Sequence, residues 1–278
     1  MKYVLVILLS VMVIACKPSS TETSTQGANA PFDLSQNLPI RWADGKLPIT
    51  INISADFTFN PGDLDGAGRN PVEQMEKAWD DAVPSKGFFI FPAPATASLG
   101  ALGLSSYNDT VIGVYKADDW FSNVSSSALA ITQFFAIKRS SGSGDYYEML
   151  HADIIVNERD FDFSYNAASN SDYDMSSVLL HEFGHLLGLG HQFDFAVPAV
   201  MQPYMSIWES NRVLFANDEQ RIKENYGVAA VVASPFILAA SAIKSSIPDG
   251  TEYHGVIELH ASGECRHFKN GKLIRSHF

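Results

Sequence analysis

Short apolar runs of strand length recur through the first half of the chain, separated by polar and turn-forming residues. The runs that predict β-strands are residues 47–53, 88–91, 110–115, 128–137 and 148–157. The segment Pro71–Ala82 has a helical period instead, because Val72, Met75 and Trp79 recur on one face and a proline stands in the first turn. Several strands with one early helix, followed by a helical second half, predict a mixed α+β domain.

Two further helices are predicted in the second half of the chain. Residues 171–174 (Ser-Asp-Tyr-Asp) offer N-cap side chains for a helix over about 175–187. Another helix is predicted over 217–226 and ends at Gly227, a residue type that often follows the last helical turn. We therefore expect the folded domain to span residues 32–227.

The segment that follows this domain has a different pattern. Residues 228–243 are apolar and rich in alanine, and Pro-Asp-Gly at 248–250 predicts a turn. Short strands are expected after the turn, and the pair Asn270-Gly271 predicts a hairpin. We interpret residues 228–278 as a C-terminal extension with a small β hairpin, to which the pattern assigns no function.

The first residues have the pattern of a targeting segment rather than of a folded domain. Lys2 supplies a positive charge, and the apolar run at 3–15 is too short to span a bilayer comfortably. Val-Ile-Ala-Cys at 13–16 resembles the lipobox of bacterial lipoproteins, in which the cysteine carries lipid. This resemblance implies a signal peptide over 1–15 and lipidation of Cys16. An ordinary signal peptide and an uncleaved anchor are the alternatives.

Residues 16–31 are rich in serine and threonine and lack large apolar side chains, so we interpret them as the lipid anchor and a flexible tether. The resemblance implies a location outside the cytoplasm. Because Lys17 rather than aspartate follows the cysteine, it favours the outer membrane or the cell surface over the inner membrane. With Cys16 lipidated, Cys265 has no partner for an intramolecular disulfide.

Composition limits the partners of the chain. It carries 31 acidic and 19 basic residues, for a formal net charge of -12. Nucleic acid and anionic lipid both select a basic surface, so neither is expected as a partner, and membrane contact is expected through the N-terminal lipid alone. A hydrophobic fraction of 46% is sufficient for a sizeable core. The oligomeric state stays open.

The candidate chemistry is concentrated in one stretch, His181-Glu182-x-x-His185-x-x-Gly188-x-x-His191. On a helix, His181 and His185 lie on one face and can direct two imidazoles at one ion. Gly188 can adopt the left-handed conformation that ends the helix, and the turn brings His191 back as a third ligand. Three nitrogen ligands with one open position are typical of catalytic zinc. Glu182 is then placed to act as a base.

This pattern is the signature of the metzincin zinc proteases, and its surroundings resemble the matrixin branch, the matrix-metalloproteinase-like enzymes and their bacterial relatives. The similar segments are Ser-Val-Leu-Leu at 177–180, Ala-Val-Met-Gln-Pro-Tyr at 199–204, and a last helix that ends in Tyr226-Gly227. The resemblance covers about residues 45–227. It implies a zincin-like fold, with a twisted mixed sheet, an active-site helix and a small, mostly helical C-terminal subdomain.

The resemblance also implies roles for individual residues. Met201 is similar to the Met-turn residue that packs beneath the zinc ligands, although a methionine in an apolar run is more often plain core. Pro203 and Tyr204 correspond to the wall of the substrate pocket. Residues 153–157 are similar to the strand that rims the cleft, so we expect a substrate peptide to lie antiparallel to an edge strand at about 150–157.

The chain departs from the family pattern in three ways. Pro203 rather than tyrosine stands two residues after Met201, which speaks against an astacin- or serralysin-type fifth ligand. The residue after the third histidine is Gln192, where serine, threonine, aspartate, glutamate or proline is usual, so the subfamily stays open. No N-terminal cysteine-switch motif is found, and the tether is too short for a folded propeptide.

Other candidate sites have weaker patterns. In the loop 60–70, Asp63 and Asp65 are spaced like the start of a calcium loop, but Ala67 and Gln74 stand where oxygen-rich ligands are needed. A polar loop is therefore favoured over a structural calcium site.

The tail contains His254, His260, Cys265 and His267, whose spacings match no familiar zinc pattern. A second metal site, or a Cys265 thiolate that caps the catalytic zinc, is the alternative to a hairpin without a metal.

The sequence thus predicts a zinc-dependent endopeptidase that acts on extracytoplasmic proteins or peptides. Zinc would activate water, and Glu182 would be the general base. One alternative is a zinc-binding adhesion or recognition module without catalysis, and another is a zinc hydrolase acting on a non-peptide amide. Retention of Glu182 favours an enzyme, because a binding module has no use for that carboxylate.

Overall fold

The computed structural model describes residues 38–99, 103–142, 144–165, 171–227, 244–262 and 265–277, with the backbone alone for Cys265 and His277. The helices are α1 (Pro71–Ala82), α2 (Met175–Leu186) and α3 (Ala216–Asn225), with 3-10 turns at Asp44–Lys46, Pro61–Asp63 and Leu104–Tyr107. The strands are β1 (Ile40–Arg41), β2 (Asn52–Ser54), β3 (Ala95–Thr96), β4 (Gly113–Ala117), β5 (Ala128–Ser141), β6 (Gly144–Asn157), β7 (Phe163–Ser164), β8 (Tyr173–Asp174), β9 (Glu252–His260), β10 (Cys265–Lys269) and β11 (Lys272–His277).

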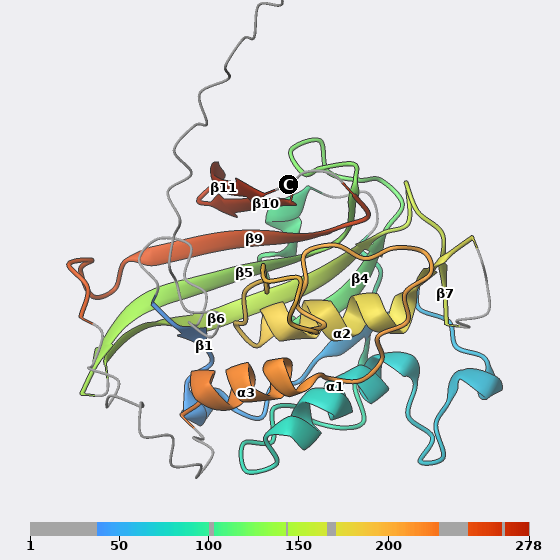
Figure 1. The fold of residues 1–278 in the computed structure, drawn as a ribbon, viewed down its shortest axis with the longest axis horizontal. Coiled ribbons are helices and arrows are strands. Elements are labelled where there is room, and N and C mark those ends of the chain that lie inside the picture. Colours follow the sequence, from blue (N-terminus) through green and yellow to red (C-terminus); the bar gives the residue numbers. More distant parts are fainter. Residues whose placement is uncertain are drawn as a thin grey trace, which may run out of the picture.

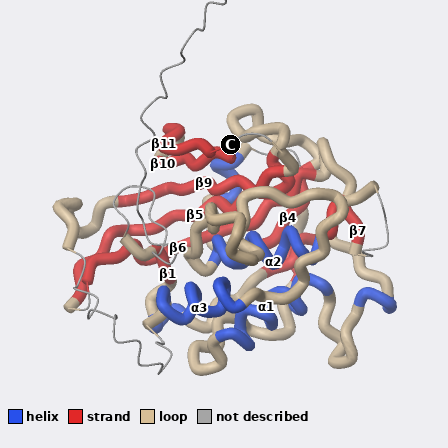
Figure 2. Tube along the Cα trace, viewed as in Figure 1, coloured by secondary structure: helices blue, strands red, loops and turns tan. Residues whose placement is uncertain are grey.

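Within these residues, nine strands form one mixed sheet, and the three helices lie on one of its faces (Figures 1 and 2). The strand order is β11-β10-β9-β5-β6-β4-β2-β3, with β1 also paired to β6. Strands β1 and β4 run parallel to β6, whereas β5 is antiparallel to both β6 and β9. The predicted α+β class is confirmed. No helix in the described part is both long and apolar enough to cross a bilayer.

Both faces of the sheet are covered, and the side chains alternate between them as strand geometry requires. In β6, Ile154 and Val156 belong to the large core between the sheet and the helices. Ile155, between them, belongs to a second cluster on the opposite face, which includes Tyr115 and Trp120. The central strands are therefore apolar on both sides.

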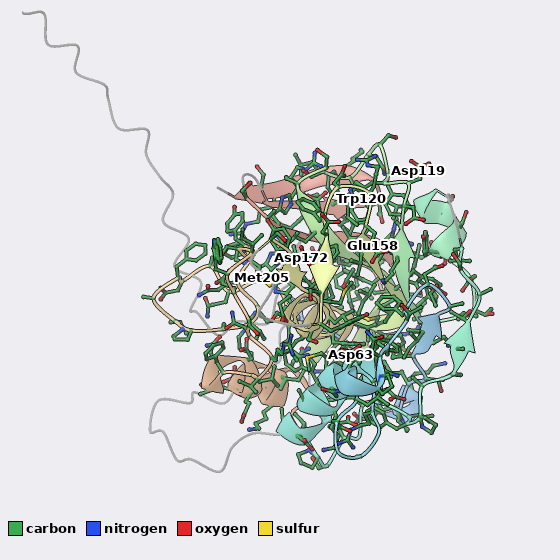
Figure 3. The ribbon with its side chains drawn as sticks, turned by 90° about the vertical axis from the view of Figure 1, so that its right-hand side faces the viewer. Asp63, Asp119, Trp120, Glu158, Asp172 and Met205 are labelled. Carbon is green, nitrogen blue, oxygen red and sulfur yellow. The ribbon has the colours of Figure 1, made fainter. Side chains whose placement is uncertain are left out.

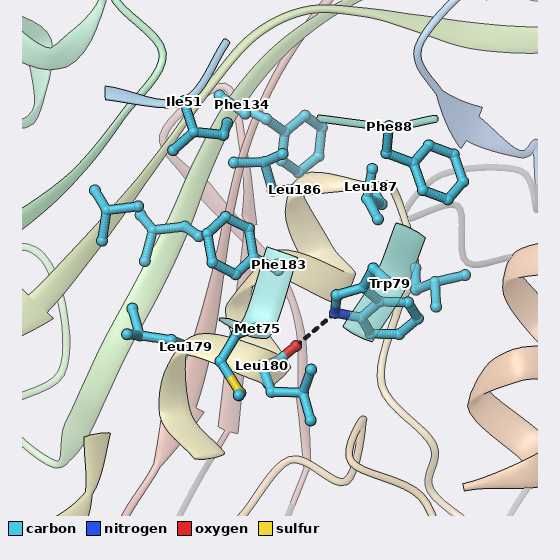
Figure 4. Close-up of a cluster of buried hydrophobic side chains, with 14 of the residues drawn as sticks. Ile51, Met75, Trp79, Phe88, Phe134, Leu179, Leu180, Phe183, Leu186 and Leu187 are labelled. Atoms are coloured by element: carbon cyan, nitrogen blue, oxygen red, sulfur yellow. Dashed lines mark hydrogen bonds between the residues drawn. The ribbon is translucent and has the colours of Figure 1, made fainter. Parts of the chain in front are cut away.

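Helix α1 fixes one side of α2. It begins with a capping box, in which the side chain of Asn70 accepts the backbone N–H of Glu73 and the Glu73 carboxylate accepts the backbone N–H of Asn70. Trp79 is fully buried, and its indole N–H donates to the carbonyl of Leu180 in α2 at 2.9 Å (Figure 4). This bond anchors α2 one residue before the first histidine of the motif.

The helix predictions are confirmed to within one residue at each end. The strands predicted at 128–137 and 148–157 are confirmed as the cores of β5 and β6. The strand predicted at 88–91 is wrong, because these residues form no ladder and Phe89 makes only an isolated bridge to Ile49. Pro48 and Pro92 lack the N–H groups that a longer ladder would need. Phe88 and Phe89 are buried, whereas Ile90 is 42% exposed, so the apolar run does not mark a strand.

The C-terminal strands belong to the main sheet. Strand β9 pairs antiparallel with β5 from Glu252 to His260, and β10 and β11 form the predicted hairpin, with Asn270 and Gly271 at positive φ. The expectation that residues 150–157 form an edge strand is wrong, because β6 pairs with β5 on one side and with β4 and β1 on the other. An apolar pattern does not separate an edge strand from a central one when both faces are buried.

The predicted signal peptide over 1–15 and the tether that begins at Cys16 lie outside the described residues. The first part of the C-terminal extension, residues 228–243, lies outside them as well. The division of the chain into domains therefore stays a prediction.

Candidate metal centre

Helix α2 carries the first two histidines of the motif. It begins after Asp174, whose carboxylate accepts the backbone N–H of Ser177 at 2.8 Å and a bond from the Arg212 guanidinium at 3.0 Å. His181 and His185 lie four residues apart and therefore share a face. Every residue of α2 is buried, so the helix cannot shift without disturbing the core.

The chain reverses after α2 through a glycine-dependent turn. The N–H of Gly188 donates to the carbonyl of His185, and the N–H of Leu189 donates to that of Gly184, which is the Schellman arrangement. Gly188 has the predicted positive φ, 88°, and a Cβ atom there would lie 2.0 Å from the carbonyl oxygen of Ile40. Glycine is therefore required at this position for both conformation and space.

The turn brings the third histidine to the first two. The Nε2 atoms of His181 and His185 are 2.9 Å apart, and that of His191 lies 3.2 and 3.0 Å from them. Two nitrogens bound to a tetrahedral zinc ion lie about 3.3 Å apart, so the triangle nearly has the required size. Within the described residues, this is the only group of three or more potential metal-binding side chains. The donor set fits zinc.

Backbone carbonyls orient two of the rings. The Nδ1–H of His181 donates to Val200 O and that of His185 to Leu189 O, each at 2.7 Å, which leaves both Nε2 lone pairs directed at the centre. Burial lowers the pKa of His181 to about 4 and the pKa values of His185 and His191 well below the ordinary range. The rings are therefore neutral, as metal binding requires.

Glu182 lies beside the three rings and is fully buried. The hydroxyl of Thr132, on β5, donates to its Oε2 at 2.6 Å, whereas Oε1 has no hydrogen-bond partner among the described residues. Burial raises the pKa of Glu182 to about 8. A buried carboxylate oxygen without a partner, next to three convergent nitrogens, is consistent with a site that holds water. The sequence predicted Glu182 but not Thr132.

Met201 packs directly against α2. It is fully buried, and a Cβ atom at Gly184 would lie 2.3 Å from its sulfur. The carbonyl of Met201 accepts the N–H of Gln192, the unusual residue after the third histidine, at 2.7 Å. The structure thus places Met201 under the helix that carries the first two histidines and ties its backbone to the turn that carries the third.

Helix α3 holds this turn through charges that the sequence did not single out. The carboxylate of Asp218 accepts the N–H of Val200 at 2.9 Å and that of Phe215 at 3.1 Å. The guanidinium of Arg221 donates to Gly190 O at 2.8 Å. Burial raises the pKa of Asp218 and lowers that of Arg221. An acidic residue in the first turn of a helix is common, so the sequence offered no distinct signal.

A hollow opens beside His181. Val200, Tyr204 and Met205 line it, together with Leu259 from β9. That Tyr204 forms the wall of a substrate pocket stays a prediction. Pro203 does not line the hollow but belongs to the same segment.

The candidate calcium loop is closed by its own residues. One carboxylate oxygen of Asp65 accepts the N–H groups of Ala67 and Arg69, and the other accepts the Arg69 guanidinium. Asp63 ends the 3-10 turn that precedes α1 (Figure 3). The structure does not support calcium here, because the Asp65 oxygens already have donors.

The tail histidines do not gather around a second ion. His260 pairs with Glu258 at 2.7 Å, and the ring of His254 stacks on the ring of Phe135 in β5. The ring of His267 instead lies 5.1 Å from that of His191. The side chain of Cys265 lies outside the described residues, so its predicted roles stay predictions.

Comparison with known families agrees with this geometry. Residues 121–227 match the family model described as Matrixin, a segment that contains β5, β6, α2, the three histidines, Met201 and α3. No curated protein matches the chain significantly.

Proposed function

We propose that the chain is a zinc-dependent endopeptidase acting on proteins or peptides outside the cytoplasm, and the match of residues 121–227 to the Matrixin family model supports this. One observation carries the proposal. Three neutral imidazole nitrogens converge beside a buried carboxylate, one oxygen of which has no hydrogen-bond partner among the described residues. A binding module would need the ligands but not this carboxylate.

The residues divide the chemistry between them. His181, His185 and His191 would hold zinc, which when bound supplies a Lewis acid that acidifies water and polarises a carbonyl. Thr132 fixes the Oε2 atom of Glu182, so that Oε1 is the atom that accepts a proton from water and later passes it to the leaving amine.

The shape of the site supports a peptide substrate. The lining of the hollow beside His181 combines the apolar side chains of Val200 and Met205 and the ring of Tyr204 with polar residues, namely Ser177, Gln202, Glu209 and Asn211. A pocket of mixed lining beside the three imidazoles is suited to a side chain next to the reacting bond.

The test compares the wild type with Glu182→Ala, each loaded with zinc, on unfolded protein substrate. We expect one zinc ion in both proteins and a loss of about 10²–10⁴-fold in the rate for the variant, because the proton-transfer group is removed. Glu219→Ala, on the exposed side of α3, serves as the control. Two equally inert proteins that both hold zinc would favour the binding module, and turnover only of non-peptide amides would favour the other hydrolase.

We also propose that Cys16 carries lipid and anchors the protein on the outer membrane or cell surface. The lipobox-like segment at 13–16 supports this. Cys16→Ser should move the protein from the detergent phase to the aqueous phase; unchanged partition would refute lipidation.

A further inference from the structure

Strand β9 covers the edge of β5 that would otherwise be exposed beside the metal centre. Strand β5 contributes Thr132, which contacts Glu182, and its other edge is occupied by β6. The pairing with β9 is antiparallel and extends from Glu252 to His260. An unpaired strand edge is a site at which extended peptides bind through their backbone. A segment of the chain itself takes that position here.

The end of β9 is held from a second side. The N–H of His260 donates to Pro203 O at 3.1 Å, and the N–H of Met205 donates to His260 O at 3.0 Å, in a parallel bridge. Residues 259–260 therefore lie between β5 and the segment that follows Met201, and they bond to both. This is how a groove with two hydrogen-bonding walls holds an extended peptide.

Leu259 occupies the position of a recognised side chain. It is 1% exposed and lines the hollow beside His181, together with Val200 and Tyr204. Leu259 pairs with Ala130 of β5, whose small side chain leaves room for the leucine. An aliphatic side chain from the tail thus forms part of the hollow that opens beside His181.

The rest of the tail closes over the same site. The ring of His267, on β10, packs at 5.1 Å from that of His191. Glu258 is fully buried and bonds to His260 and Arg266, which ties β9 to β10. The tail therefore contacts both the hollow and the third histidine.

We propose that β9 is an internal, substrate-like ligand that blocks the groove of this metalloprotease, with Leu259 in place of a substrate side chain. This inference rests on the proposed function. It assigns residues 252–262 and 265–277 to an inhibitory segment that must move away before a substrate can bind.

The first test uses the full chain, loaded with zinc, and a fluorogenic peptide with a leucine after the bond to be cleaved. Leu259→Asp places a charge at a fully buried position of β9 and should raise the initial rate by about tenfold or more, because it expels β9. Leu273→Asp, in β11, is the matched control, since Leu273 is 51% exposed and should leave the rate unchanged. Equal rates for an active wild type and Leu259→Asp would overturn the inference and leave the proposed function intact.

The second test needs no turnover and no tail substitution. Amide exchange of residues 252–260 is followed in zinc-loaded Glu182→Ala with and without excess of the same peptide. We expect the peptide to displace β9 and accelerate exchange at these amides. Unchanged exchange at peptide concentrations that saturate wild-type cleavage would show that peptide and β9 do not share a site. If no protein cleaves the peptide but the peptide still accelerates exchange, the groove assignment stands and the proposed catalysis fails.

Discussion

The residues that build the centre are polar and almost fully buried, so each depends on a specific partner. Sequence spacing alone predicted the three histidines and Glu182, because helical geometry places residues four apart on one face. It could not predict Thr132, which lies 50 positions earlier and meets Glu182 only because β5 passes beside α2. Contacts that local geometry creates can be read from a sequence, whereas contacts between distant elements need the fold.

Gly188 is the residue on which the third ligand depends most directly. Gly188→Ala should lower the free energy of unfolding and weaken zinc binding, because alanine is strained at φ 88° and its Cβ would meet Ile40 O. Thermal unfolding and zinc stoichiometry check this. Gly227→Ala is the control, since Gly227 has φ 67° but no atom within 4 Å of the added Cβ. It should cost only about 1 kcal/mol of strain and keep zinc. Equal effects would show that the close contact is unimportant.

Glu76 is a buried carboxyl that the centre does not use. Its two oxygens have no hydrogen-bond partner in the described part, and burial, together with Glu73 and Asp80, raises its pKa well above the ordinary range. The folded state therefore binds this proton more tightly than the unfolded state. The contribution of the protonated Glu76 carboxyl to the free energy of unfolding is therefore complete below a pH of about 4.3. It is lost as the pH rises through the pKa of the folded state.

Glu76→Met should remove this loss. We expect the variant to be more stable than the wild type by about 1–3 kcal/mol at pH 8, and by much less at pH 4. Thermal unfolding at the two pH values measures the difference. A stabilisation that is independent of pH would point to better packing rather than to the carboxyl.

Among the elements, the helices were easier to predict than the strands. The capping residues Asn70 and Asp174 mark where α1 and α2 begin, and these signals are local. The strand predicted at 88–91 failed because pairing there is limited to the isolated bridge between Phe89 and Ile49. The edge predicted at 150–157 failed because pairing partners come from remote parts of the chain.

Helix α3 supports the centre without touching the histidine rings. Asp218→Ala should leave the N–H of Val200 without its acceptor and loosen the carbonyl that orients His181. We expect a loss of about 10–100-fold in zinc affinity, the usual effect of removing outer partners of a metal site. Competition with a chromogenic chelator measures it. Glu219→Ala, the next residue on α3, should have no effect; if both variants bind zinc like the wild type, α3 has no positioning role.

For the whole molecule, the position of the tail was the feature least accessible from sequence. The hairpin at Asn270 and Gly271 was predicted from two residues. That β9 would extend the main sheet was not, because its partner β5 lies more than a hundred residues earlier. The matrixin-like segment at 121–227 ends before this strand, so the family pattern also carried no information about it.

Zinc should stabilise the folded state of the whole molecule, because its three ligands lie on α2 and on the turn that follows it. A ligand that binds only the folded state at 1,000 times its Kd stabilises that state by about 4 kcal/mol. For a domain of this size, zinc should therefore raise the Tm of the metal-free protein by roughly 8–16 °C. His191→Ala should abolish this shift, whereas His254→Ala should retain it, because His254 stacks on Phe135 and lies outside the cluster. Calorimetry with and without a chelator decides between these outcomes. A zinc-induced shift that survives in His191→Ala would place the stabilising ion elsewhere.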